Sequence, residues 1–231
     1  MSFTPLFATV IQDVTRNKTV YVESINAFPD PVGDTITLET DTTYIWTKPV
    51  NTGTYKFAVP TDSNITLKTT NTVANNWITE ITGSDVLLSG DIARLRIDEL
   101  DITSNNGGVC FNLSVGADLQ PNLFMTELRI TGFDSLGTLT GCSFFIENIA
   151  FSGNGDGLTL VSPPVITSDE VNFVSHTGDG FIISGTVFLA VFGSIVSTPA
   201  SGDSLFNIDA STNIILNMQF RNGQFNNSSR S

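Results

Sequence analysis

Carboxylates are the only side chains numerous enough to suggest catalysis, because the chain holds 23 Asp and Glu residues but one His. Cleavage of a glycosidic bond needs two carboxyl groups about 5–9.5 Å apart. The densest cluster lies in the segment RIDELDIT, which contains Asp98, Glu99 and Asp101. Side chains alternate between the faces of a strand, so Glu99 and Asp101 are predicted to share one face and Asp98 to lie on the other. This cluster is interpreted as a solvated outer edge; if the chain is an enzyme, the candidate catalytic residues are Glu99, Asp101 and Asp134.

Aromatic side chains are the second kind of residue that could hold a ligand, because a ring face packs well against the apolar face of a sugar. Both Trp and all three Tyr precede residue 80. Among them Trp46, Trp77 and Tyr44 are the candidates for stacking on a glycan. The alternative for all three is packing inside an N-terminal cap, because large aromatic side chains are mostly buried.

Three aspartates recur at a regular interval and form a candidate cation site. Asp156, Asp179 and Asp203 each follow a Gly and lie 23 and 24 residues apart. Calcium binds oxygen ligands, so a stack of carboxylates could hold it. The interpretation favoured here is an Asx turn in which each Asp bonds its own backbone, and no metal is expected.

The single histidine and the two cysteines exclude several other sites. His176 has no identifiable catalytic partners and is predicted to lie exposed in a turn. Cys110 and Cys142 are too few for a disulfide framework or a four-cysteine zinc site, and they are predicted to be buried free thiols. No cofactor is implied.

The elements that carry these residues are predicted to be strands throughout. No window shows apolar residues at helical spacing over three turns. Short runs rich in β-branched and aromatic residues recur instead, bounded by Gly, Asn, Asp, Ser or Pro. These runs cover 19–23, 35–38, 43–46, 55–59, 64–67, 85–88, 94–97 and 127–130.

An internal repeat predicts how the strands are arranged. The segment that begins at Phe151 aligns with the one that begins at Phe173, each holding a small Gly-Asp turn between apolar strands. A fixed turn phase and a period of about 21–24 residues predict one coil of a solenoid per repeat. The fold class is therefore all-β, a right-handed single-stranded parallel β-helix in which Phe151 lies over Phe173. The expected organisation is an N-terminal cap over residues 1–35, with a lid at 6–14, the β-helix over 36–225 and a tail over 226–231.

Charge and hydropathy limit the partners. The formal net charge is −13, which argues against nucleic acid and against an anionic membrane surface. No apolar run is long enough to cross a membrane, and the N-terminus lacks the features of a signal peptide. Only 14% of residues are charged, as expected where equivalent positions stack directly on one another and like charges repel.

Part of the sequence resembles a known group of proteins. The stretch FPDPVGDTITL at 28–38, followed by DTTYIW at 41–46 and DSNITL at 62–67, is similar to the first coil of pectate-lyase-like β-helix proteins. It most resembles virion appendages of tailed bacteriophages, and the resemblance covers roughly residues 25–225. It implies a homotrimer on the surface of a phage particle, as a tail spike, tail fibre or capsid decoration, in contact with other virion proteins and host surface polysaccharide.

The C-terminal coils suggest where subunits would meet. The run TVFLAVFGSIV at 186–196 is more continuously apolar than alternation within one coil requires, which predicts that an outer face packs against another chain. Coils continue to Phe225, so a partner subunit is expected to cover the last one. The sequence thus predicts a non-enzymatic structural protein of a virion. The alternative is a polysaccharide depolymerase or lyase of the same fold.

Overall fold

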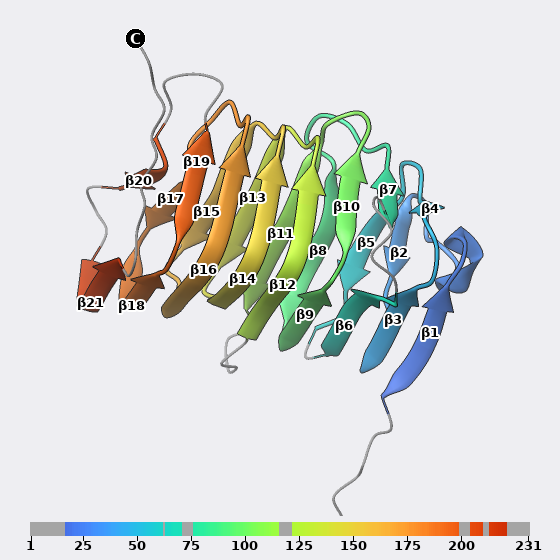
Figure 1. Ribbon diagram of the computed structural model, residues 1–231. Coiled ribbons are helices and arrows are strands. Elements are labelled where there is room, and N and C mark those ends of the chain that lie inside the picture. Colours follow the sequence, from blue (N-terminus) through green and yellow to red (C-terminus); the bar gives the residue numbers. More distant parts are fainter. Residues whose placement is uncertain are drawn as a thin grey trace, which may run out of the picture.

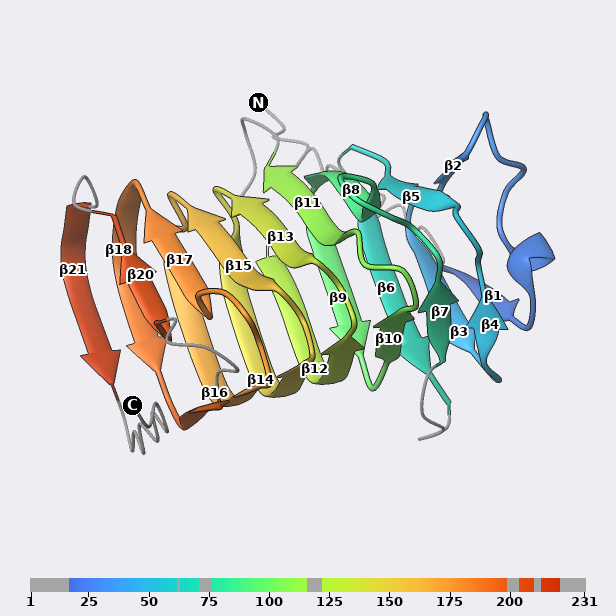
Figure 2. The ribbon, with the colours of Figure 1, turned by 90° about the horizontal axis from the view of Figure 1, so that it is seen from above.

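The computed structural model of the chain is a parallel β-solenoid (Figure 1), as the repeat predicted. It describes residues 17–61, 63–70, 76–115, 122–198, 204–209 and 213–220. Successive coils lie side by side from β1 at one end to β21 at the other, and both large sheets run the length of the molecule (Figure 2). The described residues contain no α-helix and one short 3-10 helix, η1, at Ile25–Ala27.

The larger sheet follows one path along the solenoid. In spatial order its strands are β1 (Lys18–Val22), β3 (Thr42–Trp46), β6 (Asn64–Thr69), β9 (Arg94–Asp98), β12 (Asn122–Thr131), β14 (Ser143–Ser152), β16 (Val165–Val174), β18 (Thr186–Phe192) and β21 (Asn213–Phe220). Four short strands extend it beyond a bend, namely β4 (Val50–Asn51), β7 (Trp77–Thr79), β10 (Asp101–Ser104) and β19 (Ile195–Thr198).

The smaller sheet forms the opposite wall. Its strands are, in order, β2 (Thr35–Thr37), β5 (Lys56–Val59), β8 (Val86–Ile92), β11 (Val109–Val115), β13 (Ser135–Thr140), β15 (Asp156–Val161), β17 (Phe181–Ser184) and β20 (Phe206–Ile208). Each pairing between these strands is parallel, because every coil runs in the same direction as the one before it. All eight runs predicted from the sequence overlap an observed strand.

Coil length varies more than the repeat predicted. Paired residues lie 24 apart between β1 and β3, 30 between β6 and β9, 28 between β9 and β12, and 21 between β12 and β14. The longer coils contain a separate short strand with loops on either side. In the later coils β12 and β14 run through the bend as single ten-residue strands, which shortens the coil.

The core is a set of ladders made by the inward-facing residue of each coil. Phe151 and Phe173 are paired in register, both buried, with ring centroids 5.0 Å apart, which confirms the predicted ladder. Phe181 continues the cluster edge-on to Phe173 at 5.1 Å. One contiguous cluster of buried side chains runs from Val22 to Ile195. Fully burying each large side chain stabilises the fold by about 1.5–3 kcal/mol.

The three aromatic residues proposed to stack on a glycan lie inside this core. Tyr44 and Trp46 have no exposed surface and Trp77 is 1% exposed. The indoles of Trp46 and Trp77 stack at 5.0 Å, and the Trp77 N–H donates to Thr52 Oγ1 at 3.1 Å. The glycan-stacking prediction is therefore wrong for these residues, because every ring face is covered by neighbouring side chains. They do not pack inside a separate N-terminal cap either, because Tyr44 and Trp46 lie in β3 and Trp77 in β7, within the core of the solenoid.

The expected domain limits also need adjustment. β1 pairs in parallel with β3, so the larger sheet begins at Lys18, inside the segment predicted as a cap. The proposed lid at 6–14, the tail at 226–231 and Asp203 lie outside the described residues.

His176 is buried rather than exposed. It is 1% exposed, its Nδ1 lies within hydrogen-bond distance of the Gly178 carbonyl oxygen, and its ring packs edge-on against Phe173. The prediction treated a Gly-rich turn as solvated. Here the turn directs the imidazole into the core, where the ring packs beside Phe173 and extends the aromatic ladder.

The apolar run 186–196 is explained in part by burial. Val187, Ala190 and Phe192 face the core. A register shift between Val187 and Leu189 breaks the alternation and turns Phe188 outward, where it is 44% exposed. The run therefore fills the interior and also leaves apolar surface on the outer face.

Candidate functional site

A line of strained residues marks the outer bend of the larger sheet. Glu99, Glu127, Asn148 and Glu170 all have positive φ, between 50° and 52°. The pairing register places them at the same position in four successive coils. Each residue turns its coil sharply while both flanking segments keep their parallel hydrogen bonds. A non-glycine residue in this conformation costs about 1–2 kcal/mol, and such strain concentrates at functional sites.

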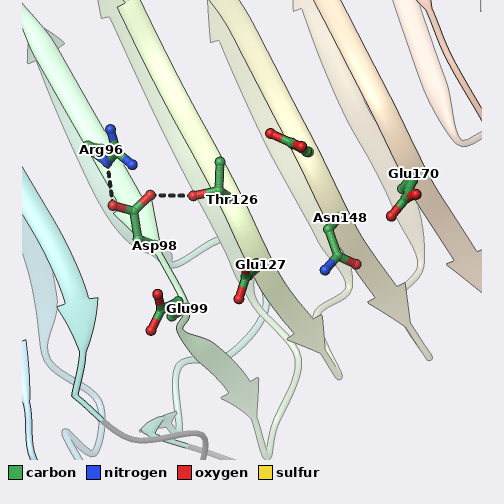
Figure 3. Close-up of a pocket in the computed structure, with 8 residues that line it drawn as sticks. Arg96, Asp98, Glu99, Thr126, Glu127, Asn148 and Glu170 are labelled. Atoms are coloured by element: carbon green, nitrogen blue, oxygen red, sulfur yellow. Dashed lines mark hydrogen bonds and ion pairs between the residues drawn. The ribbon is translucent and has the colours of Figure 1, made fainter.

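The residue before each bend is also polar and points outward. In the same four coils these residues are Asp98, Thr126, Glu147 and Asp169. Together the two columns form an acidic bend. All of its residues except Asp169 line a shallow hollow of about 380 Å³, to which Arg96 also contributes. Figure 3 shows the bend residues Glu99, Glu127, Asn148 and Glu170 following one another along the ends of neighbouring strands.

Asp98 is the most firmly held carboxylate of the acidic bend. Its side chain is 14% exposed and forms an ion pair with Arg96. The Thr126 hydroxyl donates a second hydrogen bond to its other oxygen (Figure 3). Both carboxylate oxygens of Asp98 are therefore already held by side chains of the same face, one by Arg96 and the other by Thr126.

The predicted pair Glu99 and Asp101 does not share one hollow. Glu99 lines the acidic bend, whereas Asp101 lines a neighbouring hollow and forms an ion pair with Arg129 at 3.9 Å. The prediction assumed an unbroken strand in which residues two apart face the same side. The positive φ of Glu99 interrupts that alternation, since β9 ends at Asp98 and β10 begins at Asp101.

Asp134, the third catalytic candidate, serves a turn elsewhere. Its carboxylate accepts a hydrogen bond from the Gly108 N–H at 2.9 Å, in the connection that leads into β13. It does not line the acidic bend. Among the described residues, the bend brings together Asp98, Glu99 and Glu127 in place of the predicted trio.

Of the stacked turn aspartates, Asp179 bonds the next coil, not its own backbone as the predicted turn would require. Asp156 and Asp179 occupy equivalent positions, as the register of β15 with β17 requires. Asp179 accepts hydrogen bonds from the Ser204 N–H at 2.9 Å and from the Asn207 amide at 2.6 Å. Over the part of the chain that the structure covers, no group of three His, Cys, Asp or Glu residues could hold a metal ion.

A second surface feature lies beside the acidic bend, on the outer face of the same strands. Phe124 and Phe145 are register partners whose rings stack at 5.1 Å and 14°. The Arg94 guanidinium lies 5.3 Å from the centroid of the Phe124 ring. The apolar groove next to this stack is lined by Phe124, Thr126, Phe145, Ile146, Glu147, Thr167 and Asp169.

The two cysteines take no part in either feature. Both are buried free thiols, as predicted. Burial raises the pKa of the Cys110 thiol well above its usual range and that of Cys142 to about 12. Neither thiol is therefore ionised at neutral pH.

The acidic bend corresponds to a repeat in the sequence that the spacing of the Gly-Asp turns does not reveal. It reads IDEL at 97–100, MTEL at 125–128, IENI at 146–149 and SDEV at 168–171. Each holds two polar residues, followed by an apolar residue that returns to the core. The Gly-Asp turns lie at another corner of the coil, so their period does not mark these residues.

Comparison of the chain with protein-family models, with curated proteins and with solved structures finds no match in any of the three. None of the helices in the described part of the chain has the length and apolar character needed to span a bilayer.

Proposed function

We propose that this chain is a structural protein of a tailed-phage virion, a trimer of right-handed β-helices that acts as a spike, fibre segment or capsid decoration. The observation that carries the proposal is the uninterrupted solenoid, whose core of ladders continues through every described coil. Such a body presents two continuous sheets along its axis. It would lie on the particle surface, in contact with other virion proteins and host glycans.

An outward apolar strip near the C-terminal end supports assembly. Val165 and Leu189 are register partners that face away from the core. Both side chains are half-buried, so each leaves apolar surface on the outer face. Phe188 beside them is 44% exposed. Burial of this strip at a three-fold axis would remove apolar surface worth about 25 cal/mol per Å². A closed ring also ends growth, whereas head-to-tail stacking of coils does not.

Native mass spectrometry tests the assembly. The expected species is a trimer, with three times the mass of the 24.8 kDa chain. Phe188→Lys combined with Leu189→Lys should give monomers, while Val174→Lys, on the outer surface beyond the bend, should remain trimeric. A wild-type mass equal to that of a single chain at micromolar concentration would refute the trimer.

A second function, cleavage of a polysaccharide, is favoured by the acidic bend alone. Glu99 and Glu127 lie in adjacent coils, so their backbones are about 4.8 Å apart. This spacing allows the carboxylate separations used by glycosidases. If the chain is a depolymerase, it should shorten bacterial capsular polysaccharide on size-exclusion chromatography, and Glu99→Gln should abolish this while Glu23→Gln does not. If the wild-type protein shortens no capsular polysaccharide, the depolymerase function is refuted and the structural role stands.

A further inference from the structure

The stack of side chains on the outer face of the larger sheet is incomplete at one end. Arg94 on β9 and Phe145 on β14 flank Phe124 on β12, with the guanidinium 5.3 Å from the centroid of the Phe124 ring and the two rings 5.1 Å apart. Because Phe124 lies on the β12 side, the other face of the Phe145 ring turns toward β16. The register partner there is Thr167, which is too small to cover it.

The space beyond Phe145 suits a flat group. The column continues from Thr167 to Val191 on β18. Phe145 and Val191 are thus two strand spacings apart, about 9.6 Å. A planar group stacked on the Phe145 ring would occupy the position above Thr167, within the apolar groove already described.

Carboxylates border this position. Arg96, which lines the acidic bend together with Glu147, forms an ion pair with Asp98. Glu147 has no hydrogen-bond or ion-pair partner in the described part of the chain. Asp169 accepts from the Glu170 and Ser194 N–H groups through one oxygen. Past Arg129, which pairs with Asp101, the sequence has no Lys or Arg before residue 221.

We propose that the groove beside Phe145 is a docking site for an arginine side chain presented by a protein partner. A guanidinium is planar, stacks on aromatic rings and binds carboxylates in a forked geometry. Arg94 already shows this preference at the opposite end of the same stack. The free ring face would hold the guanidinium, and Glu147 and Asp169 would supply the opposite charge. This inference does not depend on the particle role proposed above.

A binding experiment with two simple peptides tests the site. The probes are octa-arginine and octa-lysine, measured by fluorescence anisotropy against the full chain at low ionic strength. Octa-arginine should bind at least five-fold more tightly. Phe145→Leu should remove this advantage and leave the octa-lysine affinity unchanged, because only the guanidinium uses the ring. Glu147→Gln should weaken both peptides.

Matched variants at the far end of the solenoid serve as controls. Tyr21 on β1 is 61% exposed and Glu23 lies next to that strand, so Tyr21→Leu and Glu23→Gln should change neither affinity. Equal affinities for the two peptides, unaffected by Phe145→Leu, would overturn the proposal and indicate attraction by net charge alone. Competition by a neutral oligosaccharide such as maltoheptaose, lost in Phe145→Leu, would also overturn it and identify a sugar site.

Discussion

Single polar residues inside the solenoid hold its corners together. Asn154 is 2% exposed and lies in the turn between β14 and β15. Its amide donates to the Ile130 carbonyl at 3.0 Å, and its oxygen accepts from the Phe133 N–H at 3.0 Å. Both partners belong to the preceding coil. The side chain therefore replaces backbone hydrogen bonds that a sharp corner cannot form.

Asn154→Ala should lower the free energy of unfolding by about 2–4 kcal/mol, because it leaves a buried N–H and a buried carbonyl unpaired. Urea denaturation followed by circular dichroism measures the change. Asn172→Ala, an outward position on β16, should cost less than about 0.5 kcal/mol. Similar losses for both variants would contradict the role given to Asn154.

The aromatic ladder is expected to contribute more to the free energy of unfolding than the turn aspartates do. Phe173→Ala removes a buried ring and should cost about 3–5 kcal/mol. Asp179→Asn should cost much less, because the amide oxygen can still accept from the Ser204 N–H. Chelator should leave the melting temperature of wild type unchanged. A large drop in chelator would show that the aspartates hold calcium after all.

The reactivity of the thiols tests whether Cys110 and Cys142 are buried in the native protein. Because burial raises the pKa of both cysteines, the thiolate is absent from the native protein at pH 8. Native protein should not react with a thiol reagent such as Ellman's reagent from pH 7 to pH 9, and both thiols should react in urea. Rapid reaction of a native thiol, increasing with pH near 8.5, would mean that the coil around it opens.

At the scale of elements, the alternation of apolar and polar residues predicted the strands correctly. It could not predict which side chains meet at the candidate site, because the bends interrupt the alternation. Inward and outward positions are readable wherever the backbone stays extended, as at Phe151 and Phe173. The rule failed at Glu99, where a positive φ interrupts the alternation, and at Phe188, where a register shift does so. It also gave no sign that distant residues such as Asp98 and Thr126 would meet, because that depends on coil lengths, which differ from one coil to the next.

The acidic bend should itself be a source of instability. Glu99 and Glu127 lie one strand spacing apart, and like charges on adjacent strands destabilise a sheet by about 0.2–1 kcal/mol. Glu127→Gln should therefore raise the melting temperature at low salt. The gain should shrink at high salt, where the charges are screened. A melting temperature that falls in Glu127→Gln would show that the carboxylate has a stabilising partner.

At the scale of the whole molecule, the coils build a body whose two ends and outer faces differ in chemistry. The N-terminal coils enclose the indoles and carry all four lysines of the chain. The later coils carry the acidic bend, the aromatic groove and the outward apolar strip at Val165, Phe188 and Leu189. In the proposed trimer, the subunit contacts would lie near the end that carries this apolar strip.

Cryo-electron microscopy of the purified protein tests the central proposal, a trimeric β-helical rod, most directly. The account predicts particles with three-fold symmetry in which three solenoids meet near β18 and β21, with the coils that hold Trp46 and Trp77 farther from the axis. Isolated single solenoids, or particles in which the outward face of β18 points away from the symmetry axis, would contradict it.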